Sequence, residues 1–295
     1  MIDPRKQLWL LGCSHHETSL VERERLVPPA ESLEADGLRR ALANLGATES
    51  FLLSTCNRLE CYAVGPAQLG TDPRDWLCQG LPPAVDRSLF RQHAYLQQGE
   101  AAARHLFEVT SGIDSQMLGE TEITGQVKAA YQRADAAETI GPCLHRLLQK
   151  ALQAAKWART DTGIGRGQVS IGNIAAELAE RVCGSLSDSA ILQLGTGEVG
   201  ASLTQALYNR GARRLLISGR NPLKARQLAD QFSGAAIVPF EHREQTLAFV
   251  DVVISCTSSP EPVLQAADLR RIRGSEPNRP LFMIDLAVPR DIDPG

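Results

Sequence analysis

The sequence predicts two domains of different architecture: an N-terminal α+β domain with a helical part, followed by a doubly wound α/β domain. The chain has 295 residues, which is long for a single core. Its apolar runs follow a strand–helix–strand–strand order at the start and a repeated strand–helix alternation at the end. These are the patterns of α+β and α/β sheets, respectively. We place the domains at residues 1–160 and 161–295.

The first elements are expected to form a small α+β unit. Gln7–Cys13 is a short apolar run, and Ala30–Leu45 has helical spacing between a proline pair and a glycine. Two strand-like runs follow, Ser50–Ser54 and Leu59–Val64. Because only the short turn 55–58 joins them, we expect an antiparallel pair.

The middle of the chain is predicted to be helical. From about Gly99 to Leu186, apolar residues recur at helical spacing, as at Leu144, Leu148 and Leu152. Residues 163–167 are rich in glycine and polar side chains. This composition favours a hinge or a domain junction there.

The last third alternates short apolar runs with amphipathic segments such as Pro222–Phe232. This alternation predicts parallel βαβ units with helices on both faces of a sheet. The expected strands are Ala190–Leu194, Leu215–Ser218, Ala236–Val238, Val252–Cys256 and Phe282–Leu286.

Composition and charge argue against several classes of protein. Hydrophobic residues make up 43% and charged residues 22% of the chain, and the net charge is −3. A globular protein without the basic excess of a general nucleic-acid binder is expected. No apolar run reaches the length of a membrane span, and the N-terminus lacks the order of a signal peptide. Seven cysteines without CxxC spacing indicate reduced thiols. We therefore expect a cytoplasmic protein that binds no metal and no membrane.

A glycine-rich turn follows the strand expected at 190–194. It has a GxGxxG pattern, formed by Gly195, Thr196, Gly197, Glu198, Val199 and Gly200. Between a strand and a helix, the first glycine makes a tight turn, the second lets a pyrophosphate approach the backbone, and the third allows close helix–strand packing. The pattern predicts a Rossmann-type dinucleotide-binding domain. The alternative is a structural glycine turn in another α/β protein.

The end of the next strand distinguishes between nicotinamide cofactors. An NAD site usually has an acidic residue about 20 positions on, which binds the ribose hydroxyls. Here the position reads Ser218-Gly219-Arg220-Asn221, without an acid. Because arginine suits the 2′-phosphate of NADP, Ser218 and Arg220 favour NADPH. The alternative is a surface arginine that caps the following helix.

A thiol in the turn between the first two paired strands is the main catalytic candidate. Arg58, two residues after Cys56, is placed either to lower the pKa of the thiol or to bind a substrate carboxylate through a bidentate fork. The alternative for Cys56 is a small buried apolar residue. His93 is either a proton donor or a structural histidine, and Glu120 and Gln126 either contact a ligand or face water.

Several segments together resemble the glutamyl-tRNA reductase family. They are 54–63 (STCNRLECYA), 105–107 (HLF), 111–120 (SGIDSQMLGE), 125–128 (GQVK), 195–200 and 283–291 (MIDLAVPRD). The resemblance extends from about Gly12 to Asp293, and the pair STCNR and SGxDSxxLGE is specific. It makes the nucleophile the preferred role of Cys56.

The resemblance implies the NADPH-dependent reduction of glutamyl-tRNA to glutamate-1-semialdehyde, the first step of tetrapyrrole (porphyrin) biosynthesis from glutamate. Cys56 would form a thioester with the glutamyl group, and hydride from NADPH would release the aldehyde. His93 matches a histidine implicated in activity. The positions implied to hold the glutamyl group are Thr55, Asn57, Arg58, Ser115, Glu120, Thr121, Glu122 and Gln126. Glutamate-1-semialdehyde aminomutase, the next enzyme, is an implied partner.

The chain departs from the family pattern at three places. Glu122 and Thr124 stand where glutamine and leucine are usual, and residues 219–221 differ from the usual Asn-Arg-Thr. The sequence ends at Gly295, before the dimerisation domain of the family, so the oligomeric state does not follow from the resemblance. Two other interpretations stay open: a reductase of a small acyl phosphate or thioester, and a non-catalytic relative that binds aminoacyl-tRNA or a pathway partner.

Overall fold

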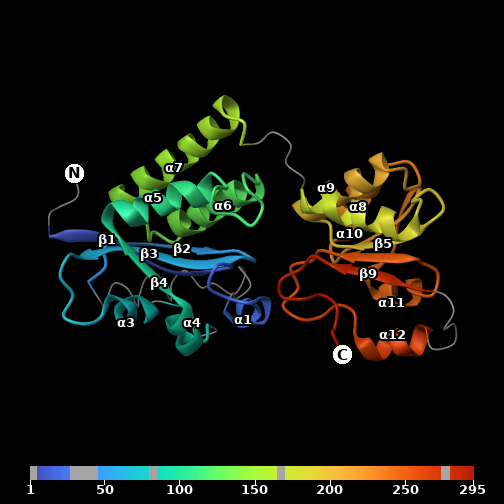
Figure 1. The fold of residues 1–295 in the computed structure, drawn as a ribbon, viewed down its shortest axis with the longest axis horizontal. Coiled ribbons are helices and arrows are strands. Elements are labelled where there is room, and N and C mark those ends of the chain that lie inside the picture. Colours follow the sequence, from blue (N-terminus) through green and yellow to red (C-terminus); the bar gives the residue numbers. More distant parts are fainter. Residues whose placement is uncertain (1–4, 27–45, 80, 82–84, 165–169, 274–279) are drawn as a thin grey trace. The chain divides into compact units, whose positions relative to one another are not determined.

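The chain forms two compact units, Met1–Gln168 and Val169–Gly295 (Figure 1). The computed structural model describes residues 5–26, 46–79, 81, 85–164, 170–273 and 280–295. The helix predicted at Ala30–Leu45 lies outside the described residues, as does most of the hinge predicted at 163–167. No helix in the described parts of the chain is long and apolar enough to cross a membrane.

The first unit is built on an antiparallel sheet in the order β2-β3-β1-β4. Its strands are β1 (Lys6–Ser14), β2 (Glu49–Ser54), β3 (Arg58–Pro66) and β4 (Tyr95–Gln98). The three strands predicted from the sequence are confirmed. The prediction lacked β4, because this short edge strand (YLQQ) carries no apolar run that would set it apart from its surroundings.

Helices cover both faces of this sheet (Figure 1). On one face lie α1 (Leu20–Leu26), α3 (Pro73–Cys78) and α4 (Arg87–His93), and on the other lie α5 (Gly99–Thr110), α6 (Glu122–Ala136) and α7 (Pro142–Asp161). Two apolar cores result, one around Trp76 and Phe90 and the other around Leu106 and Leu148. Burial on both faces explains why the strands appear in the sequence as continuous apolar runs.

A buried carboxylate joins the sheet to the start of α7. The N-cap residue Gly141 has no side chain to cap the helix, and Glu49 of β2 takes over this function. Its Oε1 accepts the backbone N–H of Cys143 at 3.1 Å, and its Oε2 accepts that of Leu144 at 2.6 Å. A Cβ at Gly141 would lie 2.7 Å from this carboxyl group, so glycine is needed for the close approach.

The second unit has a parallel sheet in the order β7-β6-β5-β8-β9. Its strands are β5 (Ala190–Leu194), β6 (Arg214–Ser218), β7 (Ala235–Ile237), β8 (Val252–Ser255) and β9 (Phe282–Asp285). All five strands predicted from the sequence are present within one residue at each end, and the doubly wound Rossmann-type architecture is confirmed. The strand order reverses between β5 and β8, which is where such sheets bind ligands.

Helices again cover both sheet faces (Figure 1). The helices are α8 (Ile171–Cys183), α9 (Glu198–Asn209), α10 (Pro222–Ala229), α11 (Arg243–Thr246), which follows the short 3₁₀ helix η2 (Phe240–His242), and α12 (Ala266–Arg273). Small residues of α8, such as Ala176 and Ala179, pack with Leu203 and Leu207 of α9 in one core. Leu264 and Leu247 belong to the core on the opposite face.

Replacing the capping carboxylate should destabilise the first unit. Glu49→Ala removes the acceptor of two helix N-terminal N–H groups, and we expect its free energy of unfolding to fall by about 1–3 kcal/mol. The three tryptophans, Trp9, Trp76 and Trp157, all lie in this unit. Urea denaturation followed by tryptophan fluorescence therefore measures its unfolding.

The matched control is Glu100→Ala near the N-terminus of α5, where the glutamate side chain is 89% exposed. This change should alter the free energy of unfolding by less than about 0.5 kcal/mol. Equal losses in the two variants would contradict a capping function for Glu49.

Candidate functional site

Cys56 lies in a tight turn that is held at both ends. The backbone N–H of Thr55 donates to the carbonyl of Arg58 at 2.9 Å, and the Thr55 hydroxyl accepts the N–H groups of Asn57 and Arg58, both at 3.2 Å. The carbonyl of Asn57 accepts the N–H of His15 at 2.9 Å. The turn therefore presents the thiol from a fixed backbone, beside the segment that follows β1.

The surroundings of Cys56 disfavour the thiolate. Burial raises the pKa of the thiol to about 11, and the charges of Glu120 and Glu122 act in the same direction. Arg23 acts in the opposite direction. The sequence suggested that Arg58 could lower this pKa. The cation that lowers it is Arg23 instead, and burial and the two carboxylates outweigh its effect. At neutral pH the resting thiol is protonated.

Arg58 is occupied by acidic partners. Its side chain is 2% exposed, and its Nη1 donates to Glu60 Oε1 at 2.7 Å and to Asp114 Oδ2 at 2.9 Å. Its Nη2 donates to the backbone carbonyl of Asp114. The guanidinium thus joins strand β3 to the loop that carries Asp114.

Glu60 is the centre of a buried polar network. Besides Arg58, it accepts hydrogen bonds from the hydroxyls of Tyr62 and Tyr95, both at 2.7 Å, and from His105 Nε2 at 2.9 Å. Burial alone would raise the pKa of Glu60, but Arg58 and the hydrogen bonds from His105 and Tyr62 hold it well below its usual range. The pKa of His105 is raised because its contact with Glu60 outweighs burial. The network therefore holds a carboxylate.

Loop 111–121 carries several predicted ligand-binding residues. It closes on itself through a 2.7 Å bond from the N–H of Gly119 to the carbonyl of Gly112, and both glycines have positive φ, 79° and 75°. A Cβ at Gly112 would lie 2.9 Å from backbone atoms of the same loop. Ser115 has a buried hydroxyl without a hydrogen-bond partner. The loop brings Glu120 close enough to influence Cys56.

Three further predicted residues lie where α6 begins. Thr121 is the N-cap residue, Glu122 lies in the first turn, and Gln126 follows one turn later. Glu122 is also one of the charges that act on Cys56. Thr124, one of the departures from the family pattern, donates its hydroxyl to the carbonyl of Thr110 at 2.8 Å. It thereby ties α6 to the end of α5.

His93 ends α4. Its Nδ1 lies 2.9 Å from the carbonyl of Glu17, and its Nε2 lies 3.3 Å from a carboxylate oxygen of Glu22 without hydrogen-bond geometry. The histidine that contacts Glu60 is His105, and not His93. The role expected for His93 stays a prediction.

Sequence reasoning did not assign Glu60, Tyr95, His105, Asp114 or Arg23 to the site. One signal was available for Glu60. Arg58, Glu60 and Tyr62 alternate along β3, and side chains at i, i+2 and i+4 of a strand lie on one face. Polar residues at this spacing in an otherwise apolar strand indicate a buried network.

In the second unit the glycines of the GxGxxG turn have distinct environments. Gly195 has a φ of 113°, and a Cβ there would lie 2.6 Å from the carbonyl oxygen of Cys256. A Cβ at Gly200 would lie 2.5 Å from the carbonyl oxygen of Gly195. At Gly197, the N-cap residue of α9, a Cβ would meet nothing within 4 Å. Packing thus accounts for the first and third glycines, and the second leaves open space for a ligand.

The end of β6 lies beside this turn. A Cβ at Gly219 would lie 3.0 Å from the side chain of Thr196, so the two loops adjoin. Ser218 has a buried hydroxyl without a hydrogen-bond partner, whereas Arg220 is exposed. Asn221 accepts the N–H groups of Leu223 and Lys224, both at 3.1 Å, and so caps α10. The capping role considered as the alternative for Arg220 therefore belongs to Asn221.

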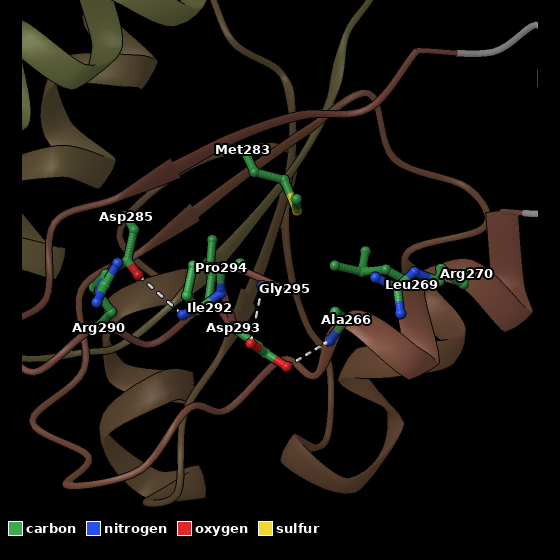
Figure 2. Close-up of a pocket in the computed structure, with 10 residues that line it drawn as sticks. All are labelled: Ala266, Leu269, Arg270, Met283, Asp285, Arg290, Ile292, Asp293, Pro294 and Gly295. Carbon is green, nitrogen blue, oxygen red and sulfur yellow. Dashed lines mark hydrogen bonds between the residues drawn. The ribbon is translucent and has the colours of Figure 1, made fainter.

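A buried aspartate holds the loop after β8. Asp291 accepts the hydroxyl of Ser255 at 2.6 Å, and both the N–H and the hydroxyl of Thr257, at 2.7 and 2.5 Å. A nearby cavity has a volume of about 430 Å³, and among its lining residues Asp285 accepts the N–H of Ile292 at 2.9 Å (Figure 2). The residues that line this cavity do not include the GxGxxG turn, Ser218 or Arg220. It does not add to the predicted cofactor site.

Comparison with protein families matches the two units to different domains. The family described as glutamyl-tRNA reductase, N-terminal domain, matches residues 11–162. The family described as shikimate / quinate 5-dehydrogenase matches residues 177–295.

Similar proteins match nearly the whole chain. A curated glutamyl-tRNA reductase from Solidesulfovibrio magneticus is 40% identical over 98% of this chain and 63% of its own length. One from Desulfotalea psychrophila is 38% identical over 98% of this chain and 67% of its own length. The chain thus spans about two thirds of these relatives.

A solved structure also covers both units. The glutamyl-tRNA reductase from Methanopyrus kandleri is 36% identical, with a TM-score of 0.52, over 98% of this chain and 68% of that protein. The N-terminal domain match includes the Cys56 turn and the Arg58–Glu60 network. On these grounds the chain belongs to the glutamyl-tRNA reductase family.

Proposed function

We propose that this chain carries the two catalytic domains of an NADPH-dependent glutamyl-tRNA reductase, which makes glutamate-1-semialdehyde for tetrapyrrole biosynthesis. In this proposal residues 1–160 bind the glutamyl group and residues 161–295 bind the cofactor. The observation that carries it is the position of Cys56, at the tip of a rigid turn and within the influence of Glu120, Glu122 and Arg23. A thiol among charged groups fits covalent catalysis better than a place in an apolar core.

The reaction proceeds in two stages. The sulfur of Cys56 bonds to the carbonyl carbon of the glutamyl ester, the bond to the ribose oxygen breaks, and that oxygen takes up a proton. The glutamyl group is then held as a thioester, which splits one difficult reduction into two easier steps. When bound, NADPH supplies the hydride that reduces the thioester to the aldehyde and returns the thiol.

Arg58 is placed to bind the side-chain carboxylate of the glutamyl group. At present the Asp114 carboxylate, which is 25% exposed, occupies one edge of the guanidinium. A substrate carboxylate would take its place, while buried Glu60 keeps hold of Nη1. His16 Nε2, 3.1 Å from Asp114, then remains as a partner for the displaced aspartate.

The other groups around the turn complete the proposed substrate site. Glu120 and Glu122 suit the α-ammonium group of the substrate, because they already make the surroundings of Cys56 negative. The unpartnered hydroxyl of Ser115 is available to a substrate oxygen or amine. The remaining proposed contacts are Thr55, Asn57, Thr121 and Gln126, and His93 is proposed as a proton donor.

The second unit is proposed to bind NADPH. A dehydrogenase family matches this unit, and the space beside Gly197 at the start of α9 suits a pyrophosphate. The buried, unpartnered hydroxyl of Ser218 and the exposed guanidinium of Arg220 fit the 2′-phosphate that distinguishes NADPH from NADH. The product is a reactive aldehyde, so glutamate-1-semialdehyde aminomutase is proposed as the partner that receives it.

Loss of the thiol should abolish covalent capture. In a single-turnover assay with radiolabelled glutamyl-tRNA and no NADPH, we expect label on the wild-type protein and none on Cys56→Ser, because serine is a much weaker nucleophile at neutral pH. Addition of NADPH should convert the bound label to glutamate-1-semialdehyde. The control is Cys183→Ser, a partly buried cysteine of the second unit, which should retain the label. A labelled Cys56→Ser protein would exclude the proposed mechanism.

Removal of Arg220 should weaken NADPH binding selectively. Loss of a charge-assisted contact costs about 1.5–3 kcal/mol, so we expect the Kd of NADPH for Arg220→Ala to rise about 10- to 100-fold while that of NADH stays nearly unchanged. Titration of cofactor fluorescence measures both constants. Arg226→Ala serves as the control, because it removes a different exposed arginine, which lies on α10. Equal weakening of both cofactors would show that Arg220 does not bind the 2′-phosphate.

A further inference from the structure

Several buried polar atoms of the first unit have no hydrogen-bond partner. Among the described residues of the first unit, the buried side-chain atoms without a hydrogen-bond partner are His15 Nδ1, Arg23 Nε, His93 Nε2 and Ser115 Oγ. Two belong to residues 15–23, and His93 contacts that segment through the carbonyl of Glu17. A buried polar atom without a partner is costly. Such atoms are suited to contact a polar ligand.

Arg23 is held in place by a short series of hydrogen bonds. Its Nη1 donates to the carbonyl of Thr18 at 2.8 Å, and the Thr18 hydroxyl donates to the carbonyl of Ser14 at 2.6 Å. Ser14 pairs with Arg58 in the β1–β3 register, and the next residue, His15, bonds Asn57. The guanidinium is therefore anchored to the strand end that adjoins the Cys56 turn.

The two buried arginines near the turn differ in whether a donor of the guanidinium group is still without a partner. In Arg58, Nη1 donates to the carboxylates of Glu60 and Asp114, and Nη2 donates to the backbone carbonyl of Asp114. Arg23 is also buried, at 9% exposure, but no carboxylate of the described residues pairs with it, and its Nε–H has no hydrogen-bond partner. Arg23 thus has a cationic donor available for an anionic atom.

We infer that Arg23 is the cation that stabilises the negative charge formed at Cys56, first on the sulfur and then on the carbonyl oxygen of the acyl group that it attacks. When the thiolate bonds to the carbonyl carbon, an electron pair moves to the carbonyl oxygen. That pair returns when the carbon–oxygen bond to the ribose breaks, and the leaving oxygen takes up a proton. The part that concerns the acyl group rests on the proposed function, and the part that concerns the sulfur does not.

The charges around Cys56 favour such a cation. Burial, Glu120 and Glu122 raise the pKa of the thiol, and Arg23 opposes them. Without it, the two carboxylates would face the developing anion with less opposing positive charge. Arg23 differs from a purely structural arginine in this respect, because its removal should change the titration of a neighbouring thiol.

Alkylation of Cys56 tests the inference without substrate. The rate with iodoacetamide follows the thiolate fraction, which rises tenfold per pH unit below the pKa. For Arg23→Gln we expect an upward shift of the Cys56 titration, so that the rate at pH 8 falls about 3- to 10-fold. Arg23→Lys keeps the charge and should remain within about twofold of the wild type. Mass spectrometry of the Cys56 peptide separates this thiol from the other six cysteines.

Arg25→Gln is the matched control. Arg25 lies on the same short helix, is 61% exposed and pairs with Asp86 at 2.8 Å. Its loss should leave the alkylation rate unchanged. Thermal unfolding of each variant identifies those that do not fold, and Arg23→Lys then still provides a folded comparison. An unchanged Cys56 titration in folded Arg23→Gln would overturn the inference.

Acylation by glutamyl-tRNA tests the second part. We expect the rate of label transfer to Cys56 to fall about 10- to 100-fold in Arg23→Gln, and also to fall in Arg23→Lys, because lysine lacks the Nε–H donor. Label transfer in wild type but an unchanged rate in both variants would overturn this part. No label on wild type, together with the expected alkylation shift, would overturn the proposed function and leave the role of Arg23 at the sulfur intact.

Discussion

The buried contact between Arg58 and Glu60 is the interaction on which the first unit depends most. A fully buried carboxylate is very costly unless every neighbouring group compensates for it. Glu60 achieves this with donors from two strands and a helix: Arg58 and Tyr62 of β3, Tyr95 of β4 and His105 of α5. Because all of these bonds are made, the network rigidifies the centre of the sheet.

The same network sets the positions of more distant parts. Through Asp114 it holds loop 111–121 against the sheet, and that loop carries Ser115 and Glu120. Space for the network is provided by Gly12 of β1, where a Cβ would lie 2.7 Å from the hydroxyl of Tyr95. A single buried ion pair thus links the strand register, the edge strand and the loop beside Cys56.

Cys56, the proposed nucleophile, is kept protonated at rest by its surroundings. Most activated cysteines gain reactivity from a lowered pKa, whereas burial and two carboxylates raise that of Cys56. Such a thiol resists chance oxidation and alkylation, because the thiolate is the reactive form. The same carboxylates suit a substrate that carries an ammonium group. In the proposed mechanism, its arrival and the charge of Arg23 shift the balance of charge around the sulfur in favour of the thiolate.

The sequence by itself determined the features that depend on neighbours along the chain. The buried strands, the parallel βαβ order and the glycine turn at 195–200 could all be predicted, since apolar periodicity and glycine conformation are local properties. The two strand-like runs on either side placed Cys56 at a turn, and the family motifs favoured it as the nucleophile. They did not show what surrounds it, because a motif identifies residue types and not their partners.

Only the tertiary structure decided the electrostatics of the site. Asp114 lies 56 residues from Arg58 in the sequence, and His105 lies 45 residues from Glu60. These separations explain why the bond between Arg58 and Asp114 and the bond between His105 and Glu60 could not be predicted. The influence of Arg23 on Cys56 likewise depends on folding, which brings the two residues near each other. The pKa of Cys56 was beyond prediction for the same reason. A pKa depends on burial and on charges brought together by folding, and neither is encoded in the spacing of residues along the chain.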